Sequence, residues 1–318
     1  MRIVSFAAGR LVGLAVTLLV MSVIVYGGLY LAPGNPVAVL TGGRPLPHRT
    51  IVAIEAQYGL NKPFFFRYVD WLGKILSGNL GKSIVFRENV STLIAARAGT
   101  TAFLVAYAAL LIIVFGVVLG LVSALRKGSQ TDAVILGTTT IGIATPSFVA
   151  AILMISIFTL GLHWFPAIGA GTGIVDRLWH LTLPSVALAM AGTAYVARLT
   201  RSAASEELQR EHVDTARSRG IPEPLVIRRH VLRNAMIPIT TVGGLTLAGL
   251  IAGSVVVENA FALNGLGSYL VTSVEQKDFP VVQAIALILV AAFVVVNTIV
   301  DILYALVDPR VTIVGASR

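Results

Sequence analysis

The sequence predicts an all-α integral membrane protein with six transmembrane helices. Only 12% of the 318 residues are charged, whereas soluble domains average about 25%. Hydrophobic residues make up 56% of the chain. Uncharged stretches recur that match or approach the roughly 20 apolar residues needed to cross the hydrocarbon core of a bilayer. These stretches are Leu11–Ala32, Ala98–Leu125, Ala133–Leu162, Leu181–Ala197, Ala235–Val257 and Phe279–Val300.

The first stretch lies close to the start of the sequence and could be mistaken for a signal peptide. Its apolar run follows Arg10 and is longer than the roughly 7–15 residues of a signal-peptide core. No convincing small-residue cleavage site closes the run. We therefore expect residues 1–32 to form an uncleaved transmembrane helix.

The connection over residues 33–97 is long and polar. It starts with Pro33-Gly-Asn-Pro36, a sequence that breaks a helix. Further along, four apolar residues recur at helical spacing and predict an amphipathic helix: Tyr68, Trp71, Leu72 and Ile75. We expect residues 33–97 to form a small extracytoplasmic subdomain between the first and second spans.

Residues 98–307 contain the other five predicted spans. The span over Ala133–Leu162 includes Thr145-Pro146, and a proline inside a helix kinks it. The span over Leu181–Ala197 is short, so we expect its helix to start earlier. Glu258 and Asp301 lie near the ends of the last two spans. We expect each to make a structural hydrogen bond rather than to relay protons, because ionisable groups at membrane depth are costly and rare.

Basic residues set the orientation of the chain. Arg2 and Arg10 flank the first span, Arg126 and Lys127 separate the second from the third, and eight arginines lie over residues 198–234. Lys and Arg collect in the cytoplasmic loops of membrane proteins, so both termini, including the tail 308–318, should face the cytoplasm. This pattern also accounts for the net charge of +9 without a nucleic-acid partner.

Residue types used in catalysis and metal binding form no recognisable site. The chain has no cysteine, which excludes thiolate chemistry, and its five histidines are scattered. Gly81-Lys82-Ser83 resembles the end of a phosphate-binding loop, but Leu76 stands where that motif needs a glycine. We therefore expect no enzyme activity, no bound metal and no cofactor in this chain.

The polar segment between the fourth and fifth spans is the main functional candidate. Leu199–Arg219 is predicted to be helical, and Gly220 would end the helix as a C-cap glycine. Ile221-Pro-Glu-Pro224 then turns the chain, because the residue before a proline resists helical geometry. A second helix follows into the fifth span, so a corner at the membrane surface can transmit a displacement into that span. Several arginines fit equally well as membrane anchors: Arg198, Arg201, Arg228 and Arg229.

This segment resembles the EAA loop of ATP-binding-cassette (ABC) importer permeases. Asp214-Thr-Ala216 and Gly220 stand where that loop has an acidic residue, two small residues and a glycine, and Pro238 matches its closing proline. Asp replaces the usual Glu, and His230 replaces a hydrophobic residue. The resemblance implies a coupling loop over residues 198–238 whose ATPase-contacting residues are Asp214, Thr215, Ala216, Arg217, Arg219, Gly220, Ile221, Pro222 and Glu223.

Further segments resemble the dipeptide, oligopeptide and nickel branch of that family over nearly the whole chain. Asn35 and Asn79 stand where Asp is more usual. The matching segments include Tyr58-Gly-Leu-Asn-Lys-Pro63, Gly78-Asn-Leu-Gly81, Thr145-Pro-Ser-Phe148, Ala197-Arg-Leu-Thr-Arg-Ser202, Gly265-Leu-Gly267, Asp278-Phe-Pro-Val-Val282 and Tyr304-Ala-Leu-Val-Asp-Pro-Arg310. Their order and spacing imply a type I ABC importer permease with its core over residues 98–307.

The resemblance implies one permease subunit of an ATP-driven importer of di- or oligopeptides, or of a related small solute, in the bacterial inner membrane. The implied partners are a homologous second permease, two ATPase subunits or domains that hold ATP and Mg, an extracytoplasmic substrate-binding protein, and lipid. Thr145, Pro146, Ser147 and Phe148 are candidates for the transport pathway. The substrate stays open among dipeptides, longer peptides, glutathione-like peptides and nickel chelates.

Two other classes of protein remain as alternatives. A stand-alone secondary transporter or channel would work without an ATPase, but it would need ionisable groups at membrane depth, and the predicted spans have almost none. A membrane enzyme would need a nucleophile with its base, or a metal site, and neither pattern is visible. An ATPase partner is the feature that separates the main hypothesis from both.

Overall fold

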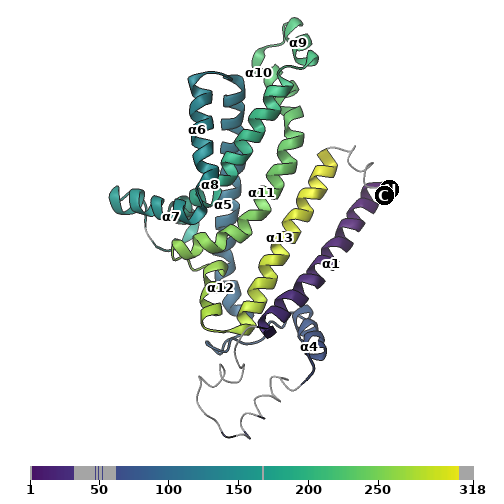
Figure 1. Cartoon of the computed structure of the whole chain (residues 1–318), viewed down its shortest axis with the longest axis vertical. Helices are drawn as coiled ribbons and strands as arrows, with labels where there is room; N and C mark the ends of the chain where they lie inside the picture. Colours follow the sequence, from purple (N-terminus) through teal and green to yellow (C-terminus); the bar gives the residue numbers. More distant parts are fainter. Residues whose placement is uncertain are drawn as a thin grey trace.

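A computed structural model shows an all-helical chain (Figure 1). The structure describes residues 2–31, 62–166 and 168–307, together with positions 47, 49 and 52. The turn predicted at Pro33–Pro36, most of the connection that precedes Lys62, and the tail 308–318 lie outside the described residues. The predicted subdomain over residues 33–97 therefore stays a prediction.

Within the residues that the structure describes, five helices are long and apolar enough to cross a membrane. They lie within α1 (Arg2–Leu31), α5 (Val90–Leu125), α8 (Gly173–Glu207), α11 (Arg233–Ala260) and α13 (Phe279–Val307). A sixth span is present if α6 (Gln130–Ala144), α7 (Ser147–Met154) and the π-helical segment η1 (Ile155–Gly161) are counted together. The predicted fold class is confirmed, and α8 starts earlier than Leu181, as expected.

The third predicted span is bent far more than a kinked helix. α6 and the α7–η1 segment meet at 108°, and in Figure 1 α7 points away from the bundle. Thr145 and Pro146 are both extended, with ψ of 116° and 146°. Pro146 has no N–H group to continue the helix, and its ring disfavours helical geometry at Thr145. The bend predicted at Thr145-Pro146 is confirmed, but its angle is far sharper than that of a kinked helix.

Small residues let α5 and α8 approach closely along the bundle. A Cβ atom on Gly116 would lie 2.7 Å from Cγ1 of Val196, and one on Gly120 would collide with the Ala197 carbonyl oxygen. Buried Leu104, Ile112, Leu181 and Leu183 fill the core around this contact. Glycine at such positions is typical of helices that pack inside membranes.

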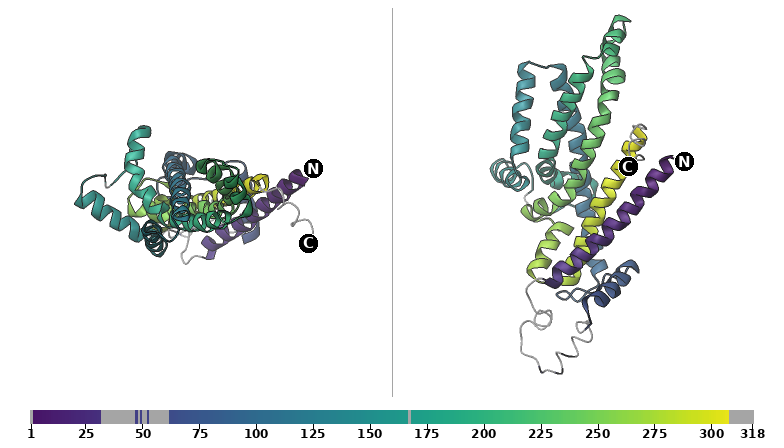
Figure 2. Two further views of the ribbon diagram at one scale, coloured as in Figure 1. Left: turned by 90° about the horizontal axis from the view of Figure 1, so that it is seen from above. Right: turned by 45° about the vertical axis from the view of Figure 1, so that its right-hand side comes forward.

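The predicted amphipathic helix is confirmed as α4 (Phe64–Leu76). Its buried residue Tyr68 forms a hydrogen bond with Ser22 of α1 across 2.8 Å. Tyr26 of α1 packs against Tyr68 and Trp71, with ring centroids 5.8 and 5.1 Å away. α1 also runs beside α13 at the edge of the bundle (Figure 2), so α4 and α13 together hold the first span.

A buried carboxylate joins α11 to α12 (Leu266–Glu275). Glu258 is fully buried, and its Oε2 accepts hydrogen bonds from the Gly267 and Ser268 N–H groups at 2.6 and 3.1 Å. These N–H groups belong to the first turn of α12, where a helix needs acceptors. The structural hydrogen bond predicted for Glu258 is confirmed, whereas the side chain of Asp301 lies outside the described part.

Candidate functional site

The segment between α8 and α11 forms a hook at one end of the bundle (Figure 1). α8 ends at Glu207, and after a turn the chain enters α9 (Glu211–Ser218) and then α10 (Glu223–Val226). The N–H groups of Gln209 and Arg210 bond to carbonyl groups three residues back, which closes the end of α8. The single helix predicted over Leu199–Arg219 was therefore wrong.

Packing explains this break. In a continuous α-helix, five residues rotate the side chain by roughly 140° beyond one full turn, so Leu208 and Val213 would face different directions. The turn at 208–210 brings both residues onto the same hydrophobic cluster. Tertiary packing thus overrides the local helical pattern.

Gly220 ends α9 in a Schellman motif, as the sequence predicts for a C-cap glycine. Its φ is +74°, a value that glycine adopts without steric cost. The Gly220 N–H donates to the Arg217 carbonyl at 2.9 Å, and the Ile221 N–H donates to the Ala216 carbonyl at 3.3 Å. These two bonds define the motif and fix the direction in which the chain leaves α9.

One face of α9 is buried against the rest of the hook. Val213 is fully buried and Ala216 is 4% exposed. They share a cluster with residues from the ends of α5 and α8 and from the helix after α9: Ala124, Ala204, Val226 and Val231, with Leu121, Leu208 and Ile221 at its edge. The site residue Ala216 therefore belongs to the base of the hook and not to its outer surface.

The opposite face of the hook is exposed and charged. The Asp214 side chain is 70% exposed, with Arg217 at 3.7 Å. Arg217 also donates two hydrogen bonds to Glu223, at 2.7 and 3.2 Å, and this guanidinium lowers the pKa of Glu223 below its ordinary value. Thr215, Arg219, Gly220 and Pro222 are exposed as well, while Ile221 is half-buried. The structure thus brings all nine predicted coupling residues into one small element.

The hook continues into the fifth span as one run of helical segments. α10 runs directly into the π-helical segment η2 (Ile227–Leu232) and then into α11, and the junction residues Ile227 and Arg233 keep helical geometry. On the α8 side, the Asn234 side chain donates to the Glu207 carboxylate at 3.3 Å and to the His230 carbonyl at 3.0 Å. The chain after the Gly220 corner is therefore helical from Glu223 to Ala260.

The pathway candidates lie at the bend between α6 and α7. Pro146 and Phe148 are exposed, and Thr145 and Ser147 are half-buried. The first turn of α7 has no side-chain cap, so its backbone N–H groups need other partners. The four pathway candidates are distant from the hook in sequence and lie on different elements. α6 is the helix that runs between the bend and the end of the bundle that bears the hook.

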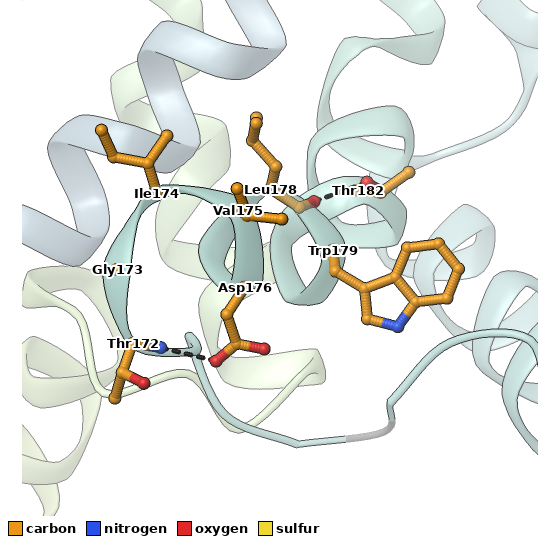
Figure 3. A pocket seen from close by; sticks show the side chains of 8 residues that line it. All are labelled: Thr172, Gly173, Ile174, Val175, Asp176, Leu178, Trp179 and Thr182. Carbon is orange, nitrogen blue, oxygen red and sulfur yellow. Dashed lines mark hydrogen bonds between the residues drawn. The ribbon is translucent and has the colours of Figure 1, made fainter.

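A second surface feature lies at the start of α8 (Figure 3). An open hollow of about 740 Å³ is lined by Thr172, Gly173, Ile174, Val175, Asp176, Leu178, Trp179 and Thr182. Its Asp176 side chain accepts a 2.7 Å hydrogen bond from the Thr172 N–H, and the Thr182 hydroxyl donates to the Leu178 carbonyl at 2.6 Å. The hollow holds none of the predicted site residues, and its lining is mostly apolar.

The motif that resembles a phosphate-binding loop has a structural explanation. The Ser83 hydroxyl and the Ile84 and Val85 N–H groups all donate to the carboxylate of Asp278, which is 1% exposed. The anion in this loop is therefore the chain's own aspartate. Within the described residues, no three His, Cys, Asp or Glu side chains come together in a way that could hold a metal ion.

Sequence reasoning missed one charged pair near the hook. Asp132 of α6 is 3% exposed and accepts two hydrogen bonds from Arg201 of α8, at 2.7 and 2.8 Å. The sequence alone leaves Arg201 as either a membrane anchor or a loop residue, and it indicates no role for Asp132. One sequence feature could have indicated this pair: Asp132 is an acidic residue at the start of a span, beside a loop that is otherwise basic.

Two family models match most of the chain. The binding-protein-dependent transport system inner membrane component matches residues 116–313, and the N-terminal part of such membrane components matches residues 3–105. The chain belongs to this family. It is a multi-pass inner-membrane permease subunit of an ABC importer, in which the ATPase is a separate component.

Curated proteins of similar length resemble this permease from end to end. A glutathione transport system permease protein of Pectobacterium atrosepticum is 38% identical over 302 residues, which cover 95% of this chain and 97% of the relative. A Brucella ovis protein whose name suggests a peptide permease is 36% identical over 310 residues, with 95% and 97% covered. The glutathione permease protein of an Escherichia coli strain is 35% identical over 307 residues, with 96% and 98% covered.

Proposed function

We propose that this permease imports small peptides, or a peptide-like solute such as glutathione, into the cytoplasm. Relatives named for peptide and for glutathione transport support this substrate class. The complex would contain a homologous second permease, two ABC ATPase subunits or domains with ATP and Mg, and an extracytoplasmic substrate-binding protein. This chain would supply the docking element and part of the pathway, and it would bind no cofactor of its own.

The proposed orientation places the hook and both termini in the cytoplasm. The basic residues of the hook and of the turn at Arg126–Lys127 support it through the positive-inside rule. The start of α1 and the end of α13 both point toward the end of the bundle that bears α9 (Figures 1 and 2). A cytoplasmic hook is also the arrangement that an ATPase needs to reach α9.

The observation that carries the proposal is a charged helix held on a rigid base. α9 presents Asp214 outward and buries Val213 and Ala216 inward, and the chain after it continues as helix from Glu223 to Ala260. Closure of the ATPases on ATP would push α9, and α11 would follow because the two are joined through the Gly220 corner. Nucleotide would thereby shift the permease between two conformations.

Asp214→Arg tests the docking surface. Reversing an exposed charge at an interface opposes its electrostatic complementarity, so we expect at least about a tenfold loss of ATPase copurified with the membrane complex, equivalent to roughly 1.4 kcal/mol. Asp70→Arg is the matched control, because Asp70 is a similarly exposed carboxylate on α4. Equal ATPase recovery from Asp214→Arg and wild type would remove Asp214 from the docking surface.

We further propose that the bend at Thr145–Phe148 borders the transport pathway. Non-helical backbone at membrane depth is tolerated only where protein covers it or water reaches it. Pro146 and Phe148 are exposed at this bend, and the uncapped start of α7 leaves N–H groups available. A water-filled path between this permease and its partner would satisfy those groups.

A single cysteine tests the pathway, because the native chain has none. In Ser147→Cys, a membrane-impermeant thiol reagent should label the protein at least about tenfold faster than in Ile152→Cys, since apolar surroundings suppress the thiolate that reacts. Ile152 is an exposed apolar residue on the same α7 helix and serves as the control. Trapping the complex with ATP and vanadate should change the rate at residue 147 alone. Equal and constant rates at both positions would contradict the assignment.

A further inference from the structure

The buried aspartate at the start of α6 has four donors around it. Arg201 donates two hydrogen bonds to Asp132, from Nε at 2.7 Å and from Nη2 at 2.8 Å. The Gly128 N–H donates at 2.9 Å, and the Ser123 hydroxyl of α5 donates as well. One carboxylate thus connects α5, the α5–α6 turn, α6 and α8. Charge-assisted, two-pronged contacts of this kind fix geometry as well as adding stability.

A second arginine one turn earlier in α8 extends the contact. Arg198 donates from Nε to the Thr139 hydroxyl at 3.3 Å and from Nη2 to the Thr140 hydroxyl. Further along α6, a Cβ atom on Gly142 would lie 3.1 Å from the Cβ atom of Ala194. α8 therefore holds α6 from its first turn to within a few residues of the bend at Thr145–Pro146.

The same part of α8 supports the hook. Ala204, three residues after Arg201, is fully buried in the cluster that contains Val213 and Ala216 of α9. Ala124 of α5 belongs to this cluster too, and its neighbour Ser123 is the donor to Asp132. The seat of α9 and the Asp132–Arg201 pair are therefore parts of one packed unit.

We propose that Asp132 and Arg201 are positioning residues that make α6 move as one body with α8 and α9. A displacement of the hook then reaches the Thr145–Pro146 bend through α6, in addition to reaching α11 through Gly220. The proposal rests on the proposed function, because it assumes that α9 receives the ATPase. A pair that only stabilised the fold would lower the amount of permease without changing how the remaining molecules couple ATP to transport.

Asp132→Asn tests this distinction, with Asp70→Asn as a control that removes the charge of an exposed ion pair on α4. We expect normal ATPase copurification but about a tenfold fall in solute transported per ATP hydrolysed, a typical size for coupling between two sites. Asp70→Asn should match wild type. If Asp132→Asn is not recovered from the membrane, Arg201→Lys replaces it, because it keeps the charge and loses the two-pronged contact. Wild-type coupling in the variant that is recovered would overturn the proposal.

Cross-linking supplies a rescue that a purely structural role does not predict. Asp132→Cys with Arg201→Cys removes the ion pair, and a short bifunctional thiol reagent can rejoin α6 to α8 in a chain that has no other cysteine. We expect transport per ATP to fall before cross-linking and to recover at least about fivefold after it. A cross-link that leaves coupling low, or lowers it further, would show that the two helices must separate and would overturn the proposal.

The outcomes also separate this proposal from the function on which it rests. If the wild-type permease recruits no ATPase, the proposed function fails whatever the variants do. If wild type couples ATP to transport and both the variants and the cross-linked protein couple equally well, only the role of the Asp132–Arg201 pair fails.

Discussion

Gly220→Pro is expected to abolish transport while the chain still enters the membrane. Gly220 has φ of +74°, whereas proline holds φ near −65°. Proline would also remove the N–H that donates to the Arg217 carbonyl at 2.9 Å. The Schellman motif cannot form without that geometry, so α9 would leave its seat and ATPase stimulation by substrate would be lost. The measurement is transport and stimulated ATPase activity in reconstituted membranes, at matched amounts of permease.

Gly220→Asn is the control for this change. Asparagine tolerates left-handed backbone better than other residues that have a side chain, and space around Gly220 is open, with no atom within 4 Å of an added Cβ. We expect this variant to keep most of its transport. Normal transport by Gly220→Pro would contradict the role assigned to the corner, and equal loss in both variants would show that side-chain bulk, not backbone geometry, is responsible.

Val213→Asp should remove the ATPase from the complex without touching the outer face of α9. Val213 is fully buried among the apolar residues Ala204, Ala216 and Val226. An unpaired carboxylate in such a place costs about 3 kcal/mol or more, which opposes the packing of α9 on the rest of the hook. We expect α9 to detach and ATPase copurification to fall to background, as measured by pulldown from solubilised membranes.

Val213→Ala separates the effect of charge from the effect of lost packing. Removing the two methyl groups leaves a small cavity and should cost about 1–2 kcal/mol, less than a buried charge. We expect a partial loss of ATPase recovery, about tenfold for 1.4 kcal/mol, that stays above the background level expected for Val213→Asp. Wild-type recovery with Val213→Asp would mean that the buried face of α9 does not hold the docking surface in place.

Local chemistry explains which features were predictable. Gly220 and Pro222 mark the corner because their backbone preferences act whatever surrounds them. The spacing of Tyr68 and Trp71 predicts α4 because helical periodicity is a local property. Glu258 was assigned a structural hydrogen bond because a carboxylate near a span end needs donors, and the start of α12 supplies them.

The missed features depend on contacts between distant residues. The helix breaks at 208–210 because the residues on either side pack against Ala124 and Val231. These two residues lie outside the segment, so its own sequence does not reveal the break. Pro146 predicts a disturbance in the third span, but the 108° angle depends on where α7 finds neighbours. Asp132 and Arg201 are 69 residues apart, and nothing in either segment identifies the other as its partner.

The Asp278 carboxylate fills the loop that resembles a phosphate-binding loop. By doing so it also anchors one end of α5. It ties the residues just before α5 to the start of α13, and Thr101 of α5 accepts the Leu266 N–H of α12. At the other end of α5, Ser123 donates to Asp132. A helix of 36 residues, about 54 Å long, is thus fastened at one end to the α12–α13 corner and at the other to α6 and α8. The contacts of α5 therefore connect the α12–α13 corner at one end of the fold with α6 and α8 at the other.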